Sequence, residues 1–172
     1  MKTRVVGLAV AGVAVSLAIA YAASDTFSER AAKDQVTFVP SGDAAMAKAF
    51  EKARATLDEF LALAKTPPPN TDFFSVKVRI SDAANDEYFW VGDFRVEGNN
   101  FSGRVDNAPR FVKKVREGER IQFDRRDIVD WMYINTIEPR MYGNFTLCVL
   151  LKQESAAERA KVIEQYRLQC DG

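Results

Sequence analysis

Residues 74–105 read FSVKVRISDAANDEYFWVGDFRVEGNNFSGRV, and this stretch decides the fold class. Apolar and polar residues alternate over residues 74–80, and a second strand is expected over residues 87–96, which is rich in aromatic and β-branched residues. The EGNN sequence that follows is typical of a hairpin turn, so residues 101–105 should return as a third strand. Because successive strands joined by short turns are antiparallel, the stretch predicts an antiparallel sheet.

Helical patterns flank this sheet on both sides. Apolar residues recur every three or four positions over residues 43–65, after a capping Asp43, and the PPPN sequence at residues 67–70 ends that helix. Ser155 and Glu158 are spaced as a capping box, which predicts a closing helix to about residue 168. Between them we expect strands at residues 110–115, 120–123, 131–137 and 145–151, and a helical turn at residues 125–130. This order of one helix, several strands and a second helix predicts an α+β fold. We expect a curled antiparallel sheet of six or seven short strands, or a partly closed barrel, with the N-terminal helix packed on it and a C-terminal helix.

The N-terminus has the pattern of an export signal. Lys2 and Arg4 precede the apolar run Val5–Ala20, and the AYA sequence at residues 20–22 supplies the small residues that a signal peptidase reads. An uncleaved anchor helix over residues 5–23 is the alternative, since a membrane span needs about 20 apolar residues. We therefore expect a signal peptide at residues 1–22, and a periplasmic or secreted protein without integral membrane association. If the signal is not cleaved, residues 5–23 anchor the protein to the membrane.

Cleavage after residue 22 leaves an N-terminal arm at residues 23–42 and a single α+β domain at residues 43–170. The whole chain has 24 basic and 24 acidic residues, so it offers no general attraction for nucleic acid. Cys148 and Cys170 are the two cysteines. In an oxidising compartment they form a structural disulfide or remain two unpaired thiols, and the distance between them decides which.

No histidine is present, which excludes Ser–His–Asp and Cys–His catalysis and histidine-bound zinc. No glycine-rich phosphate loop follows a strand. The sequence therefore predicts no cofactor, no metal site and no catalytic residue of these kinds.

Aromatic residues on neighbouring predicted strands are the main binding candidates. These residues are Trp90, Trp131, Tyr133 and Tyr142, and if several of them share an outer face, they form a stacking platform for a sugar or a peptide. Asn107 and Asp130 complete the predicted ligand-binding set. The alternative is that aromatic residues in strands belong to the core.

Carboxylates give a second candidate site. Asp127 and Asp130 are three residues apart and would share one face of a helical turn, while Glu87 and Asp93 lie on or beside the second strand. Two carboxylates that flank a cleft would suit the cleavage of cell-wall sugars. The alternative is that these acids are caps and turn residues.

The block from residue 74 to residue 151 resembles the YegJ-like family of bacterial proteins, whose function is unknown. The matching motifs are EYFWV at residues 87–91, FSGR at 101–104, NAP at 107–109, IVDWMY at 128–133 and GNFT at 143–146. The resemblance implies a sheet-rich domain that is often exported, and it supplies no catalytic residues. One departure is Tyr88, where a polar residue, often histidine, is expected.

Together these observations predict an exported, non-catalytic protein that binds an unknown protein or envelope ligand through an aromatic-bearing face. A carboxylate-based hydrolase of cell-wall material is the alternative, and a purely structural role without a concave pocket is the third hypothesis.

Overall fold

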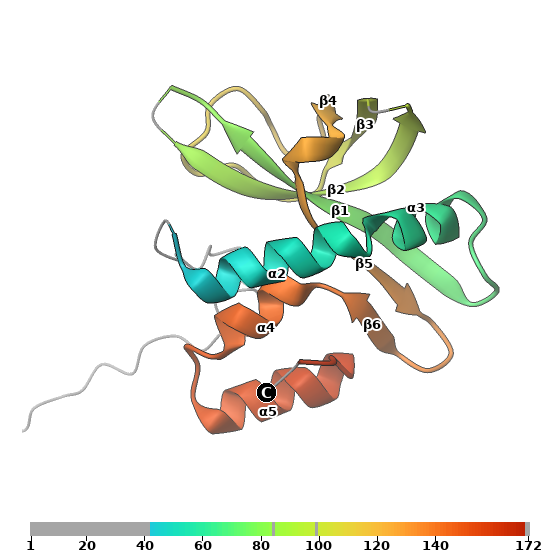
Figure 1. Cartoon of the computed structure of the whole chain (residues 1–172), viewed down its shortest axis with the longest axis vertical. Coiled ribbons are helices and arrows are strands. Elements are labelled where there is room, and N and C mark those ends of the chain that lie inside the picture. The colour runs from blue at the N-terminus through green and yellow to red at the C-terminus, as the bar shows by residue number, and fades with distance from the viewer. Residues whose placement is uncertain (1–41, 84, 99, 171–172) are drawn as a thin grey trace, which may run out of the picture.

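Six antiparallel strands form one sheet, with helices before and after it (Figure 1). The computed structural model describes residues 42–83, 85–98 and 100–170, so the predicted signal peptide and nearly all of the predicted arm lie outside the described residues. In chain order the elements are α2 (Ala44–Ala55), α3 (Leu57–Lys65), β1 (Thr71–Ser81), β2 (Asp86–Glu97), β3 (Asn100–Val105), β4 (Arg120–Asp124), the 3₁₀ turn η1 (Arg125–Asp127), β5 (Ile128–Asn135), β6 (Arg140–Gly143), α4 (Phe145–Leu151) and α5 (Ala156–Tyr166).

The strand order β4-β3-β2-β1-β5-β6 requires the sheet to curl. Three strands separate β4 from β5, yet only η1 connects them along the chain, so the end of β4 must approach the start of β5. The pairing of β1 with β5 stops at Val78 and Ile128, which leaves the sheet open between the last residues of β1 and β4. The predicted α+β fold with a curled antiparallel sheet is therefore confirmed, and the barrel is not closed.

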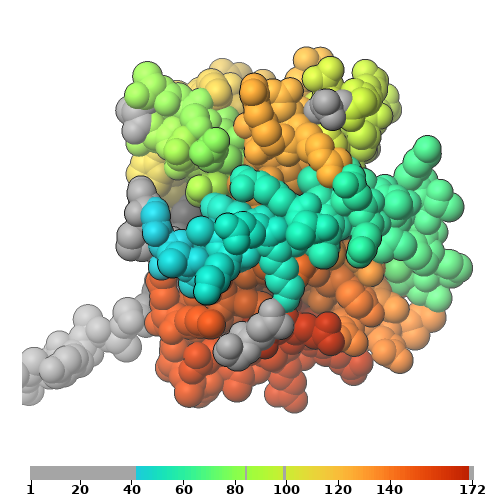
Figure 2. All heavy atoms as spheres, in the orientation of Figure 1, coloured from blue at the N-terminus to red at the C-terminus, as the bar shows by residue number. Residues whose placement is uncertain are grey.

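The main core lies between the sheet and the two N-terminal helices. Val76 pairs with Val91 and Val78 pairs with Phe89, so all four side chains share one face, and all four are fully buried. Phe60 of α3 is packed in the same cluster. Figure 2 shows α2 and α3 as a continuous band across one face of the molecule, with β-strands on one side and α4 and α5 on the other. Burial of each large side chain stabilises the fold by about 1.5–3 kcal/mol.

A second, smaller core joins the two C-terminal helices. Leu147 and Leu151 of α4 pack against Val162 of α5 and against Leu168. A disulfide between Cys148 and Cys170 connects the same two segments, with 5.4 Å between their Cα atoms. Among the described residues no helix has the length and apolar character of a membrane span.

The predicted strand at residues 145–151 was wrong, because these residues form α4. The FTLCVLL sequence is a short apolar run, which fits a buried strand and a buried helix equally well. The run becomes helical because Asp130 of the neighbouring strand accepts hydrogen bonds from the first amides of the helix. The predicted helix at residues 43–65 is in fact two helices, α2 and α3, which meet at Thr56.

Three further segments differ from the prediction. Residues 110–115 form no strand, because the backbone amides of Arg110, Phe111 and Val112 donate to the Glu87 carboxylate instead of to a strand partner. The predicted helical turn at residues 125–130 ends at residue 127, and β5 begins at Ile128. Residues 140–143, for which no strand was predicted, form the short edge strand β6.

Candidate ligand-binding site

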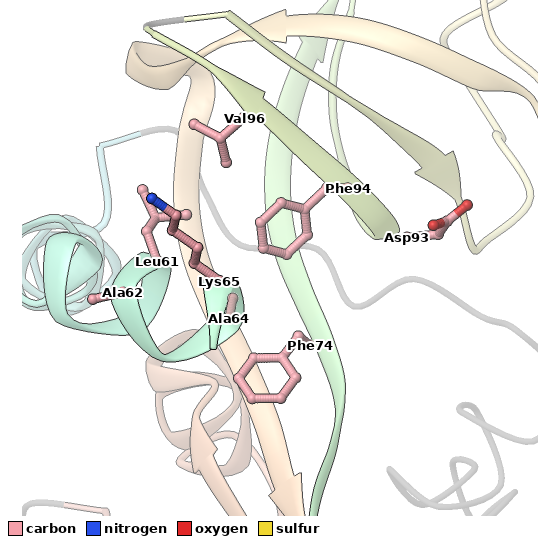
Figure 3. A pocket seen from close by; sticks show the side chains of 8 residues that line it. All are labelled: Leu61, Ala62, Ala64, Lys65, Phe74, Asp93, Phe94 and Val96. Atoms are coloured by element: carbon pink, nitrogen blue, oxygen red, sulfur yellow. The ribbon is translucent and has the colours of Figure 1, made fainter. Parts of the chain in front are cut away.

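A groove of about 530 Å³ lies where β1 and β2 diverge beside α3 (Figure 3). The helix contributes four of the lining residues and the two strands contribute the other four. They are Leu61, Ala62, Ala64 and Lys65 from α3, Phe74 from β1, and Asp93, Phe94 and Val96 from β2. Most of this lining is apolar, so the groove is suited to an apolar ligand.

The groove lies where β1 and β2 stop pairing, and a β-bulge lies on each strand beside it, one in the pairing of β1 with β5 and the other in the pairing of β2 with β3. The pairing of β1 with β2 runs from the hairpin turn to Val76 and Val91, and the described residues form no β1–β2 pairs beyond this point. One bulge contains Phe73 and the other contains Asp93, and these two residues have φ angles of 59° and 44°. A non-glycine residue in such a conformation costs about 1–3 kcal/mol. The fold therefore holds strained backbone on both strands that flank the groove.

The bulges turn two phenylalanine rings toward the helix. The ring centroids of Phe74 and Phe94 each lie 5.9 Å from that of Phe60. Figure 3 shows both rings beside α3, with the Asp93 carboxylate directed away from them. Phe74 and Phe94 remain partly accessible, and Val96 at the rim is 47% exposed. The groove is thus a half-open apolar surface with an aromatic floor.

A row of stacked rings continues from the groove toward β6. Tyr133 lies between Phe74 and Tyr142, with centroid distances of 5.1 Å and 4.7 Å, and the Arg140 guanidinium lies 5.2 Å from the Tyr142 ring. Burial raises the pKa of Tyr133, and the neighbouring Tyr142 hydroxyl acts in the same direction. The predicted site residue Tyr133 is therefore part of an aromatic row that packs against the Phe74 ring.

Trp131 is placed in the core. It is 8% exposed, and its ring stacks on that of Phe60 at 4.9 Å. The indole Nε1–H donates to the Ala53 carbonyl oxygen at 3.1 Å and to the Thr56 hydroxyl at 3.2 Å. Trp131 therefore holds the junction of α2 and α3 against the sheet, and it presents little surface to a ligand.

Trp90 and Asn107 fasten the long loop between β3 and β4. The Asn107 Oδ1 atom accepts a hydrogen bond from the Trp90 backbone amide at 2.9 Å. The half-buried Trp90 ring lies 4.6 Å from the Lys77 ammonium, which is in the position of a cation–π contact. The structure does not bring either residue into the groove.

Asp130 is fully buried and surrounded by donors. Its Oδ1 atom accepts from the backbone amides of Trp131 and Phe145, at 2.9 and 3.2 Å. Its Oδ2 atom accepts from the Thr146 amide at 2.9 Å and from the Thr146 hydroxyl at 2.7 Å. That hydroxyl oxygen in turn accepts from the Lys77 ammonium at 2.8 Å. Asp130 therefore caps the start of α4 and connects it to the sheet.

Burial acts on the two charged groups of this network in opposite directions. Burial raises the pKa of Asp130, while Lys77 and the Thr146 donors oppose that change. Burial lowers the pKa of Lys77, and the Asp130 charge opposes it. A lysine beside a hydroxyl can activate a nucleophile in hydrolases, but the Thr146 side chain is buried and its proton is directed at Asp130. The network has the features of a structural support.

The other candidate acids also have structural partners. Asp127 accepts from the Asp124 amide at 3.2 Å, and Asp93 forms an ion pair with Arg120. Glu87 is buried and accepts from three consecutive backbone amides in the β3–β4 loop. Asp93 is the one carboxylate among the groove residues, so the described lining contains no pair of acids. The described residues also contain no cluster of three or more acidic or cysteine side chains that could hold a metal ion.

Of the groove residues, the sequence indicated Asp93 alone, as a candidate carboxylate, and none of the apolar residues that form the lining. The available signal was an interruption of the strand pattern: Phe89 and Val91 point inward, so strict alternation would also place Asp93 inward. A charged residue at an inward position indicates a bulge, and the bulge brings Phe94 inward instead. The two consecutive phenylalanines at residues 73 and 74 give the same signal in β1.

The comparisons with known proteins agree on the family. A family described as "Uncharacterized protein conserved in bacteria (DUF2314)" matches residues 43–169. The chain is 33% identical over 123 residues to "Uncharacterized protein YegJ" of Escherichia coli K12, an alignment that covers 69% of this chain and 78% of that protein. It is 28% identical over 134 residues to "Putative ankyrin repeat protein NMB1133/NMB1171" of Neisseria meningitidis serogroup B, covering 73% of this chain and 52% of that protein.

The chain thus spans about half the length of the Neisseria protein. No solved structure matches this chain. The resemblance to YegJ-like proteins, first indicated by the EYFWV and IVDWMY motifs, is confirmed by the family match and by the Escherichia coli relative. Since the match covers the sheet, the groove and the C-terminal helices, this chain belongs to the bacterial DUF2314 family of uncharacterized proteins.

Proposed function

We propose that this protein is exported and binds an apolar ligand of the cell envelope in the groove between α3 and the diverging ends of β1 and β2. The observation that supports this most is the strained, half-open aromatic surface around Phe74 and Phe94. Bulges and strained backbone occur preferentially where the direction of a side chain matters for function. Exposed apolar surface next to such a feature is typical of a binding site.

The arrangement of acids favours binding over hydrolysis. A carboxylate hydrolase needs two acids that flank a cleft open to substrate. Asp130 and Glu87 are instead buried and saturated with hydrogen bonds from the protein's own backbone. The cell-wall hydrolase is therefore the weaker of the two hypotheses.

Two observations support export. The first is the signal pattern of residues 1–22, with its charged, apolar and small residues in order. The second is the disulfide between Cys148 and Cys170, since disulfides persist mainly in oxidising compartments. Cell fractionation followed by N-terminal sequencing tests whether the protein is exported and where its signal is cleaved. We expect a periplasmic or secreted protein that begins at Ala23, and a full-length protein in the cytoplasm would refute export.

A dye-binding experiment tests the groove. The probe is anilinonaphthalene sulfonate, an apolar fluorophore with one negative charge. We expect saturable binding to the purified protein, and a loss of affinity of about fivefold or more, or roughly 1 kcal/mol, in Val96→Glu, which adds a negative charge at the rim. The matched control is Ile137→Glu, because Ile137 is 69% exposed and lies outside the groove. Equal binding by the wild type and both variants would refute the groove as the binding site.

A further inference from the structure

We infer that the groove binds the C-terminal end of an extended peptide, which adds as a strand to the open edge of β2 while its terminal carboxylate meets Lys65. This inference rests on the proposed function, because it names the class of ligand that the same groove would take.

The first argument is the open edge of β2. Beyond the bulge at Asp93, Arg95, Val96 and Glu97 pair with β3 on one side only. On the other side, which faces the groove, the described residues supply no partner strand past Val91. A strand edge of this kind has backbone N–H and C=O groups available for a further strand. An extended peptide satisfies them, whereas a helix or a lipid chain has no free backbone groups to offer.

The second argument is the shape of the lining. Phe94 and Val96 both line the groove and are two residues apart, which is the repeat of side chains on one face of a strand. An added strand has the same repeat, so every second side chain of the peptide would enter the apolar space between these residues and Leu61. The groove therefore favours a peptide with apolar residues at alternate positions.

The third argument is charge complementarity. Lys65 and Asp93 are the two ionisable residues among the eight that line the groove. Asp93 is paired with Arg120 and is directed away from the phenylalanine rings (Figure 3). Lys65 forms no ion pair within the described part of the chain. The groove thus combines an apolar floor with one available cation, which matches the carboxylate at the end of a peptide.

Fluorescence anisotropy with a labelled peptide tests the inference. The probe is a dye-labelled heptapeptide of sequence GSTVTVF with a free C-terminus, added to the purified full-length or naturally processed protein. We expect saturable binding, which weakens about fivefold or more, or roughly 1 kcal/mol, when the C-terminus is amidated or when Lys65 is replaced by Glu. The peptide GSTPTPF should not bind, because proline cannot donate to a strand ladder. Lys48→Glu, at an exposed lysine of α2 outside the groove, is the matched control and should bind normally.

The outcomes separate this inference from the proposed function. If anilinonaphthalene sulfonate binds and Val96→Glu weakens its binding, but GSTVTVF does not bind, the groove is a binding site and the peptide inference is wrong. If GSTPTPF binds as well as GSTVTVF, or if laurate displaces the peptide and binds more tightly, strand addition is refuted and an acyl chain is the better ligand. If neither dye nor peptide binds, both proposals fail.

Discussion

Replacement of Asp130 by Asn should lower the free energy of unfolding by about 3–5 kcal/mol, the range for breaking one side of a buried charge network. The Oδ2 atom of Asp130 accepts two hydrogen bonds from Thr146, at 2.9 and 2.7 Å. In the variant one carboxylate oxygen becomes an NH₂ group. If that group takes the place of Oδ2, it faces two donors and cannot accept from them. Each hydrogen bond to a charged group contributes about 1.5–3 kcal/mol, so the loss of two such bonds accounts for the predicted range.

Urea-induced unfolding followed by circular dichroism measures this change, provided that the slope of the transition is unchanged. Asp127→Asn is the matched control, because that half-buried acid caps a 3₁₀ turn, and caps contribute about 0.5–2 kcal/mol. A double-mutant cycle with Lys77→Met isolates the network. We expect a coupling of at least about 1 kcal/mol between Asp130 and Lys77. A loss below that of the Asp127 control, together with no coupling, would refute the assignment of Asp130 as the support of α4.

Four further predictions test other parts of the structure. Glu87→Gln should lower the free energy of urea unfolding by about 2 kcal/mol and should speed amide hydrogen exchange in the β3–β4 loop. Unchanged exchange rates would show that the Glu87 carboxylate does not hold this loop. Replacing Cys148 and Cys170 with Ser opens a loop with a sequence separation of 22 and should lower stability by about 3 kcal/mol, measured against the oxidised wild type. Gly143→Ala should lower the free energy of unfolding by at least about 2 kcal/mol, since Gly143 has a φ of 74° and an added Cβ would clash with the Trp131 backbone oxygen. A thermal unfolding midpoint equal to that of the wild type would refute this. Burial lowers the pKa of Lys77 in the folded protein below its ordinary value of 10.5. Between the folded and unfolded pKa values the unfolded chain binds more protons, so the free energy of unfolding rises with pH in that range. The wild type should therefore gain stability relative to Lys77→Met as the pH increases toward 10.5, and parallel pH profiles of the two proteins would contradict this prediction.

The sheet was largely predictable from local sequence. Residues 74–80 alternate cleanly between apolar and polar, and the EGNN turn leaves little choice about where β3 returns. The order of β4 and β5 was less accessible, because it depends on how strongly the whole sheet curls. Residues 145–151 show the limit of a short apolar run: the choice between strand and helix was made by Asp130, a residue on another element.

The candidate site was harder to predict for a related reason. The sequence indicated which aromatic residues exist but not which of them face water. Trp131 is buried in the core, where it stacks on Phe60 and donates to the Ala53 carbonyl oxygen, whereas Phe94 is brought to the groove by a bulge at Asp93. A bulge changes the face of every following side chain, so an error of one residue in register reverses the prediction of which residues are available.

The most direct test of the binding groove is an NMR titration of the ¹⁵N-labelled protein with the free-carboxylate peptide GSTVTVF. The account predicts that the largest amide shift changes fall within residues 61–65, 73–75 and 93–97, which border the groove. Changes centred on Trp90 and Asn107, or no changes at saturating peptide, would contradict the claim that this groove is the peptide-binding surface of the protein.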